Sequence, residues 1–269
     1  MRIRIPARGR QMQTLVLQPG NSRRPLVETP GILWIHGGGY ESGMAEMVYV
    51  SRAMALVRKY GAVVVSPQYT LSVKDPYPAA MEDCYAALVY MHDHAEELGF
   101  NRNRILIGGE SAGGGLAAAL CMVARDRGEV RIRYQMPLYP MLDCEDTDSS
   151  RDNHGIMWNT RRNHAAWKRY LRNVEKPVSC YASPSRCTDY SNLPPAYTFV
   201  CDGEPFYCET LTYIQNLKQA GVDAHVDVYP GRVHAFDMLL PWKKKSRIAA
   251  RCFEKEYEYA LTHYLEDTV

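Results

Sequence analysis

The stretch ILIGGESAGGGLAAAL, residues 105–120, decides the fold of this chain, because an apolar strand pattern passes directly into an alanine-rich helix pattern. Five glycines lie at or just after this junction. Glycine weakens both helices and strands, so its concentration here indicates a sharp turn or a close approach of backbones. Three devices place glycines at such a junction: a phosphate-binding loop, a dinucleotide fingerprint and a nucleophile elbow.

The first two devices fit this junction poorly. A phosphate-binding loop needs a lysine that reaches the phosphates, and no lysine occurs between Asp75 and Lys168. A dinucleotide fingerprint matches only loosely from Gly113, and it does not follow the strand directly. The third device is Gly-x-Ser-x-Gly, which the segment GESAG provides with Ser111 at its centre. We therefore predict a strained turn that presents the Ser111 hydroxyl above the sheet.

A nucleophilic serine needs hydrogen-bond donors that stabilise the oxyanion of the reaction. The motif HGGGY, residues 36–40, ends another apolar strand pattern and carries three consecutive glycines. The backbone N–H groups of Gly38 and Gly39 are free to meet a substrate oxygen there. Together with the N–H of Ala112, they are predicted to form an oxyanion hole.

The serine also needs a base and an acid that orients this base. His234 follows the last strand pattern, so we predict that it is the base. His36 lies in the glycine loop and His225 inside a strand pattern, which makes both weaker candidates. The loop after the strand pattern at 196–202 offers three acids: Asp202, Glu204 and Glu209. The chain order is then serine, acid and histidine, as in α/β-hydrolases.

Apolar runs and helix patterns alternate along the chain, which predicts an α/β fold with a mostly parallel sheet and helices on both faces. One or two antiparallel strands from the first 20 residues are expected to join this sheet. The strand patterns cover residues 31–37, 62–67, 104–109, 134–140, 196–202 and 224–230. The helix patterns cover residues 45–60, 79–98, 111–126, 206–220 and 246–265.

The chain has 269 residues and is predicted to form a single domain, residues 1–269. Residues 143–195 break the alternation, because they carry many charges, two tryptophans, several prolines and one helix pattern near 160–173. Ligands bind at the carboxyl ends of the strands in open α/β sheets. We therefore predict that residues 143–195 form a cap-like insertion over the active site.

The composition gives no sign of a nucleic-acid, membrane or metal partner. A net charge of +2 gives no indication of nucleic-acid binding, and the basic run Lys243–Lys245 is interpreted as a solvated helix start. Charges interrupt every apolar run of residues 1–18, so we expect a cytoplasmic protein with no membrane partner. The eight cysteines, and the pair His92 and His94, lack metal-ligand spacing, so neither a metal nor a cofactor is expected.

Five motifs occur in order along the chain: HGGGY, GESAGGG, YASP, LPPAYTFV and YPGRVHAFD. Together they resemble the hormone-sensitive-lipase-like esterases, which are bacterial family IV of the α/β-hydrolases. The resemblance covers residues 28–265. It implies the α/β-hydrolase fold with an eight-stranded, mostly parallel sheet, hydrolysis of short acyl esters, and no cofactor.

Two features depart from the family pattern. Glu204-Pro205 stands where the family shows Asp-Pro when the following helix is kept in register. The resemblance therefore implies that Glu204 is the acid, with Asp202 as second choice and Asp237 as an anchor of the histidine loop. Members also carry N-terminal helices that cap the pocket, whereas few residues precede His36 and they read as strands. We therefore expect a reduced cap.

These observations predict a serine carboxylesterase that acts on small-molecule esters, from acetyl to about hexanoyl, through an acyl-enzyme. Two alternatives stay open: an amide or formamide hydrolase on the same triad, and a non-catalytic small-molecule-binding α/β-hydrolase. The presence of Ser111, His234 and an acid favours catalysis. A reduced cap leaves apolar surface at the pocket edge, so a homo-oligomer, specifically a dimer, is expected.

Overall fold

The computed structural model describes residues 1–20 and 25–265, which build one mostly parallel β-sheet covered by helices. The strands are β1 (Arg2–Ala7), β2 (Arg10–Leu17), β3 (Gly31–Ile35), β4 (Val63–Pro67), β5 (Ile105–Glu110), β6 (Tyr134–Leu138), β7 (Ala196–Cys201) and β8 (Ala224–Tyr229). Among the described residues, these eight strands follow the order β1-β2-β4-β3-β5-β6-β7-β8. β2 is antiparallel to both β1 and β4, and the other pairs are parallel. The predicted sheet and its antiparallel N-terminal entry are confirmed.

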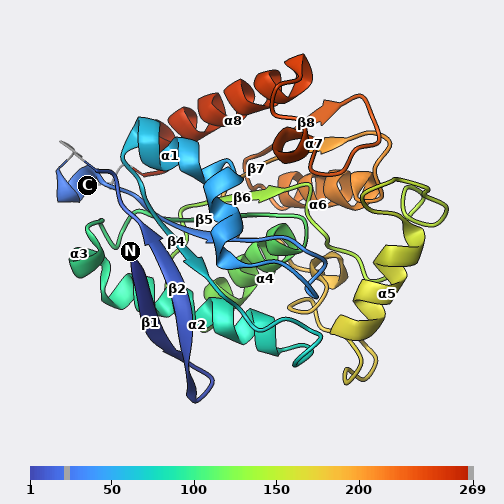
Figure 1. The fold of residues 1–269 in the computed structure, drawn as a ribbon, viewed down its shortest axis with the longest axis horizontal. Helices are drawn as coiled ribbons and strands as arrows, with labels where there is room; N and C mark the ends of the chain where they lie inside the picture. The colour runs from blue at the N-terminus through green and yellow to red at the C-terminus, as the bar shows by residue number, and fades with distance from the viewer. Residues whose placement is uncertain (21–24, 266–269) are drawn as a thin grey trace.

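Helices cover both faces of this sheet (Figure 1). The α-helices are α1 (Ala53–Tyr60), α2 (Ala79–Asp93), α3 (Ala95–Leu98), α4 (Ala112–Arg127), α5 (Thr160–Tyr170), α6 (Tyr207–Gln219), α7 (Phe236–Leu239) and α8 (Lys244–His263). Three short 3-10 helices are η1 (Leu26–Glu28), η2 (Ala45–Val50) and η3 (Pro184–Arg186). α1 and α8 pack on one face, while α2, α4 and α6 pack on the other.

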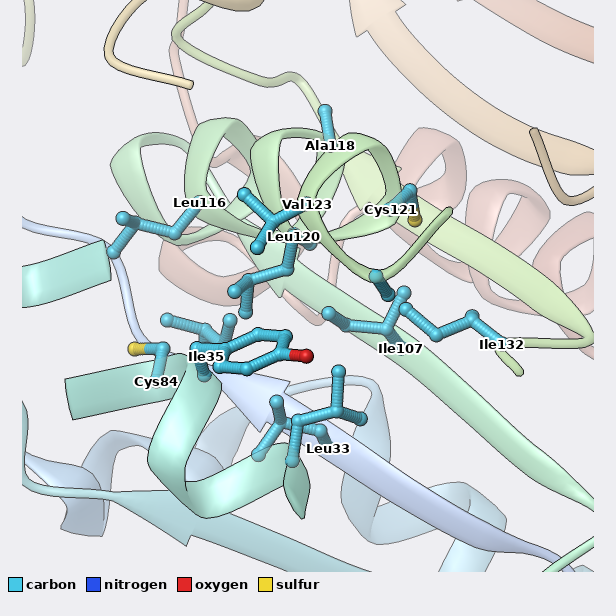
Figure 2. Packing of buried hydrophobic residues seen from close by; sticks show 14 of the residues in the cluster. Leu33, Ile35, Cys84, Ile107, Leu116, Ala118, Leu120, Cys121, Val123 and Ile132 are labelled. Carbon is cyan, nitrogen blue, oxygen red and sulfur yellow. The ribbon is translucent and has the colours of Figure 1, made fainter. Parts of the chain in front are cut away.

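The core explains why these strands read as continuous apolar runs rather than alternating ones. Every residue of β3, β5 and β6 is buried, because helices cover both faces of the sheet. α4 is buried from Ala112 to Ala124, and its glycines and alanines let it lie close to the sheet. Figure 2 shows Leu120 and Val123 of α4 above Ile107 of β5. This packing fixes the start of α4 relative to the end of β5.

Two of the predicted helices are divided. The pattern at 45–60 is η2 followed by α1, because the Ser51 hydroxyl donates to Val48 O at 2.8 Å and accepts from Ala53 N at 3.1 Å. The pattern at 79–98 breaks at His94, whose φ of −110° and ψ of 22° lie outside the helical region. Among the described residues, no helix is long and apolar enough to cross a membrane.

Residues 143–195 contain α5 and η3. α5 is attached to the loop after β3, because Tyr170 stacks on Tyr40 with ring centroids 4.0 Å apart. An ion pair between Arg169 and Glu41 joins the same two segments. Figure 1 shows α5 at the edge of the molecule, apart from the helices that cover the sheet.

Candidate active site

Ser111 lies on the sharp turn between β5 and α4. Its φ of 56° and ψ of −120° are rare for a residue with a side chain. The turn needs small neighbours, since a Cβ on Gly113 would lie 2.1 Å from the carbonyl oxygen of Ile35. The backbone N–H of Ser111 donates to Leu138 O at 3.0 Å, which ties the turn to β6. This is the geometry expected of a nucleophile elbow.

His234 lies beside this serine, although 123 residues separate the two along the chain. Its Nε2 is 2.9 Å from Ser111 Oγ. The rings of Tyr139 and Phe206 meet the imidazole edge-on, with centroids 5.1 and 5.0 Å away. Only 7% of His234 is exposed, so the two aromatic rings and the serine restrict its orientation.

Glu204 is the acid that meets the other side of this imidazole. Its fully buried carboxylate pairs through Oε2 with His234 Nδ1, and its Oε1 accepts from Cys201 N at 2.9 Å. Asp202 instead accepts from Gly231 N at 2.9 Å and holds the loop after β8. Glu209, the third candidate, accepts from the backbone N–H of Leu142 at 2.6 Å. Of the three acids, the structure brings Glu204 to the histidine.

The two weaker histidine candidates lie in other environments. His36 is 1% exposed and stacks on Tyr69 with centroids 4.2 Å apart. Burial lowers the pKa of His36 to about 4, so its ring is neutral at ordinary pH. His225 is more exposed and pairs with Glu256, with 2.8 Å between its Nδ1 and a carboxylate oxygen. His36 Nδ1 instead meets Gly37 O at 2.8 Å, and the His225 ring meets the ring of Tyr197 edge-on.

The serine and histidine open into a cavity of about 260 Å³. The predicted donors Gly38 and Gly39 belong to its lining. Ala112 is the first residue of α4, where backbone N–H groups lie outside the helix's own hydrogen bonds. The apolar side chains of the lining are Met47, Tyr139, Met157, Trp158, Ala235, Met238 and Leu239. The cavity can therefore take an apolar group next to the nucleophile.

A buried polar cluster beside the cavity was only partly predicted from the sequence. Asp237, expected to anchor the histidine loop, accepts from Tyr139 OH at 2.9 Å and pairs with Arg52 Nε at 3.0 Å. Glu110, next to the nucleophile, accepts from Trp34 Nε1 at 2.9 Å, and burial raises its pKa to about 8. No sequence signal identifies Arg52, because 185 residues separate it from Asp237.

The described part of the chain offers no group of side chains suited to metal binding. Residues 1–20 and 25–265 hold no group of three or more His, Cys, Asp or Glu side chains that could bind a metal ion. His94 instead stacks on Tyr90, with ring centroids 4.0 Å apart. His92 pairs with its neighbour Asp93 at 3.1 Å.

A family model described as the alpha/beta hydrolase fold matches residues 32–238. Esterase LipI of Mycobacterium tuberculosis is 32% identical over 216 residues, which cover 78% of this chain and 66% of LipI. The chain thus spans just under two thirds of the length of this curated relative.

Solved structures resemble the chain over nearly its whole length. A bacterial heroin esterase is 34% identical with a TM-score of 0.88, over 98% of this chain and 83% of that one. A hyperthermophilic esterase from Pyrobaculum calidifontis is 32% identical with a TM-score of 0.87, over 97% of this chain and 84% of that one. The family match, the motif order and the sheet agree, so this chain belongs to the hormone-sensitive-lipase-like esterase family of the α/β-hydrolases.

Proposed function

We propose that this protein is a serine carboxylesterase that hydrolyses short-chain acyl esters of small molecules through an acyl-enzyme. The observation that carries this proposal is the buried relay in which His234 lies between Glu204 and Ser111. A weak hydroxyl nucleophile needs such a base, and the base needs an acid that fixes its orientation. Similarity to esterases of one family supports the same reaction class.

In the proposed reaction, His234 Nε2 takes the proton of Ser111 Oγ as this oxygen bonds to the acyl carbon. The carbonyl π electrons move to the carbonyl oxygen, which accepts hydrogen bonds from the backbone N–H groups of Gly38, Gly39 and Ala112. The imidazolium then protonates the leaving alcohol, and the acyl-enzyme forms. Water repeats the sequence with His234 as base, which releases the carboxylic acid and restores the Ser111 hydroxyl.

Glu204 is proposed to hold the imidazole with Nδ1–H toward its carboxylate and to stabilise the positive charge on the ring. Its burial strengthens this interaction, because water does not screen it. The oxyanion donors are backbone groups on fixed elements, so little reorganisation accompanies the reaction. Loss of one such donor typically lowers the rate by about 10² to 10³.

The cavity supports a short acyl group, from acetyl to about hexanoyl. Its volume of about 260 Å³ is below the range of about 300 to 1,000 Å³ typical of drug-sized ligand pockets. Residues 143–195 are proposed to act as the cap, because two of their side chains, Met157 and Trp158, line the cavity with Ser111. Hydrolysis of an amide would need stronger protonation of the leaving group than hydrolysis of an ester.

The proposal is tested with p-nitrophenyl esters of increasing acyl length, with matched anilides, and with a serine-directed phosphonate. We expect turnover of acetate and butyrate esters and a single phosphonate adduct on Ser111. Ser111→Ala should lose several orders of magnitude in kcat and all labelling, since nucleophile and base act as a unit. Ser191→Ala, at a serine outside the cavity lining, is the matched control.

Three results would contradict the proposal. Retention of more than about a tenth of wild-type turnover in Ser111→Ala excludes the nucleophile. Faster hydrolysis of anilides than of esters makes the enzyme an amidase. Absence of both turnover and labelling in the wild-type protein points to a binding protein instead.

A further inference from the structure

The indole of Trp158 lies directly against the glycine loop. An ideal Cβ on Gly39 would be 2.3 Å from Trp158 Cη2, so only the absence of a side chain at residue 39 leaves room for the ring. Gly39 has a φ of 60°, and both residues line the cavity. The tryptophan therefore closes the cavity on the side of the predicted oxyanion donors.

Trp158 is held in this position from several directions. Its Nε1 donates to the Oδ1 of Asn163, which is 2% exposed, at 3.2 Å. The preceding turn is fixed because Asn153 N donates to Thr160 Oγ1 at 2.7 Å and Asn159 Nδ2 donates to Gly155 O at 3.1 Å. A side chain held in this way forms a wall rather than a mobile lid.

A series of aromatic contacts joins Trp158 to the proposed base. The rings of Trp158 and Phe206 have centroids 6.2 Å apart, and Phe206 meets His234 edge-on at 5.0 Å. His234 must reach the leaving oxygen to protonate it, so the alcohol lies on the His234 side of the scissile carbon. This leaves the part of the cavity lined by Gly39 and Trp158 for the acyl chain.

We propose that Trp158 is the specificity-determining residue that limits the length of the acyl chain, through the contact between its indole and Gly39. This inference rests on the proposed esterase function and names the residue that sets its substrate range. The aromatic ring occupies the volume that the distal carbons of a longer chain would need. Shortening this side chain extends the cavity without changing the nucleophile, the base or the acid.

The test compares kcat and KM for p-nitrophenyl acetate, butyrate, hexanoate and octanoate in the wild type, Trp158→Phe, Trp158→Leu and Trp158→Ala. The octanoate-to-butyrate ratio of kcat/KM should rise at least about tenfold in Trp158→Ala, mainly through a lower KM for octanoate. Trp158→Phe and Trp158→Leu should lie between it and the wild type. The control is Trp242→Ala, at a tryptophan that is 64% exposed and outside the cavity lining.

Phosphonate titration of each variant counts the intact active sites, so a lost fold is not mistaken for a changed preference. If Trp158→Ala does not fold, the order of the ratios among the wild type, Trp158→Phe and Trp158→Leu decides. Unchanged ratios in fully titrated variants overturn the inference. Failure of the esterase proposal is distinct from these results, since the wild type would then neither label nor hydrolyse any ester.

Discussion

Ser111 has a φ of 56°, and such a backbone conformation costs a residue with a side chain about 1 to 3 kcal/mol. Hydrogen bonds from neighbouring segments hold the Ser111 backbone in this conformation. Its N–H donates to Leu138 O, and its carbonyl accepts from Gly115 N at 2.9 Å and Met141 N at 3.0 Å. The hydroxyl is thereby placed at the cavity, 2.9 Å from the imidazole of His234. Strain at this single residue is stored where the proposed chemistry needs it.

The first prediction concerns the acid. Glu204→Gln should lower kcat by several orders of magnitude with little change in melting temperature, because the amide no longer stabilises a protonated His234. Asp202→Asn is the matched control. It should retain most activity and loosen the loop after β8, since Asp202 accepts from Gly231 N. Steady-state kinetics and thermal unfolding check both, and a normal Glu204→Gln beside an inactive Asp202→Asn would reverse the assignment.

The second prediction concerns Glu110. Burial raises its pKa to about 8, whereas an unfolded glutamate titrates near about 4.3. As pH rises between these values, the unfolded chain releases a proton that the folded protein keeps. Glu110 therefore lowers the free energy of unfolding by at most about 1.4 kcal/mol per pH unit. This contribution to stability is complete below the unfolded pKa and is lost as pH approaches the folded pKa.

Glu110→Gln removes this proton equilibrium and keeps an oxygen that accepts from Trp34 Nε1. The melting temperature of the variant, relative to that of the wild type, should increase steadily from about pH 5 to about pH 8. Glu97→Gln, at an exposed glutamate, should show a constant difference. Parallel curves for wild type and Glu110→Gln would contradict the prediction.

At the scale of elements, the histidine loop is tied to a helix far away in the sequence. Arg52 precedes α1 and pairs with Asp237 at 3.0 Å, while Asp237 lies on α7, three residues after His234. The Asp237 side chain has no exposed area and also accepts from Tyr139 OH. A buried carboxylate needs such a partner, so this contact fixes α7 against α1.

The third prediction tests this ion pair. Arg52→Met leaves the Asp237 carboxylate buried without its cation and should cost about 3 to 5 kcal/mol of stability. It should also lower kcat more than it raises KM, because His234 loses its fixed position. The double variant Arg52→Met with Asp237→Asn should recover part of the stability, measured by denaturant unfolding. Arg58→Met, at an exposed arginine of α1, is the control, and an equal effect of both variants would contradict the prediction.

The whole molecule gathers its site from four separate loops at one edge of the sheet. The glycine loop follows β3, Ser111 follows β5, Glu204 follows β7 and His234 follows β8. Neighbouring parallel strands end at the same edge, so loops distant in sequence meet there. Two apolar side chains near these loops are exposed to water: Ile156 is 88% exposed and Leu239 is 40% exposed.

The fourth prediction concerns assembly. Exposed apolar surface near a pocket is commonly buried by self-association. We expect a dimer with about twice the 30.6 kDa mass of the chain, measured by light scattering at micromolar concentration. A mass of 30.6 kDa under these conditions would show a monomer and contradict the prediction.

Local patterns of the sequence determined the fold class, the elements and the nucleophile. All six strand patterns correspond to strands of the sheet, because an apolar run between turn residues is a property of consecutive residues. The nucleophile elbow at Ser111 could be predicted from the sequence because a tight turn needs glycines at fixed spacing. The division of the helix pattern at 45–60 into two helices could not be predicted, since it depends on the two hydrogen bonds of the Ser51 hydroxyl.

The family register implied Glu204 as the acid, but only the tertiary structure shows which side chains meet. Asp202 and Glu204 are two residues apart and chemically alike, yet the sheet aims only Glu204 at the imidazole. The pairs formed by Arg52 with Asp237 and by Trp158 with Gly39 join segments more than 100 residues apart. Such contacts depend on how whole elements pack, and no pattern of neighbouring residues shows which distant segments lie together in space. Periodicity therefore determines the elements, while packing of the elements decides the partners of each side chain.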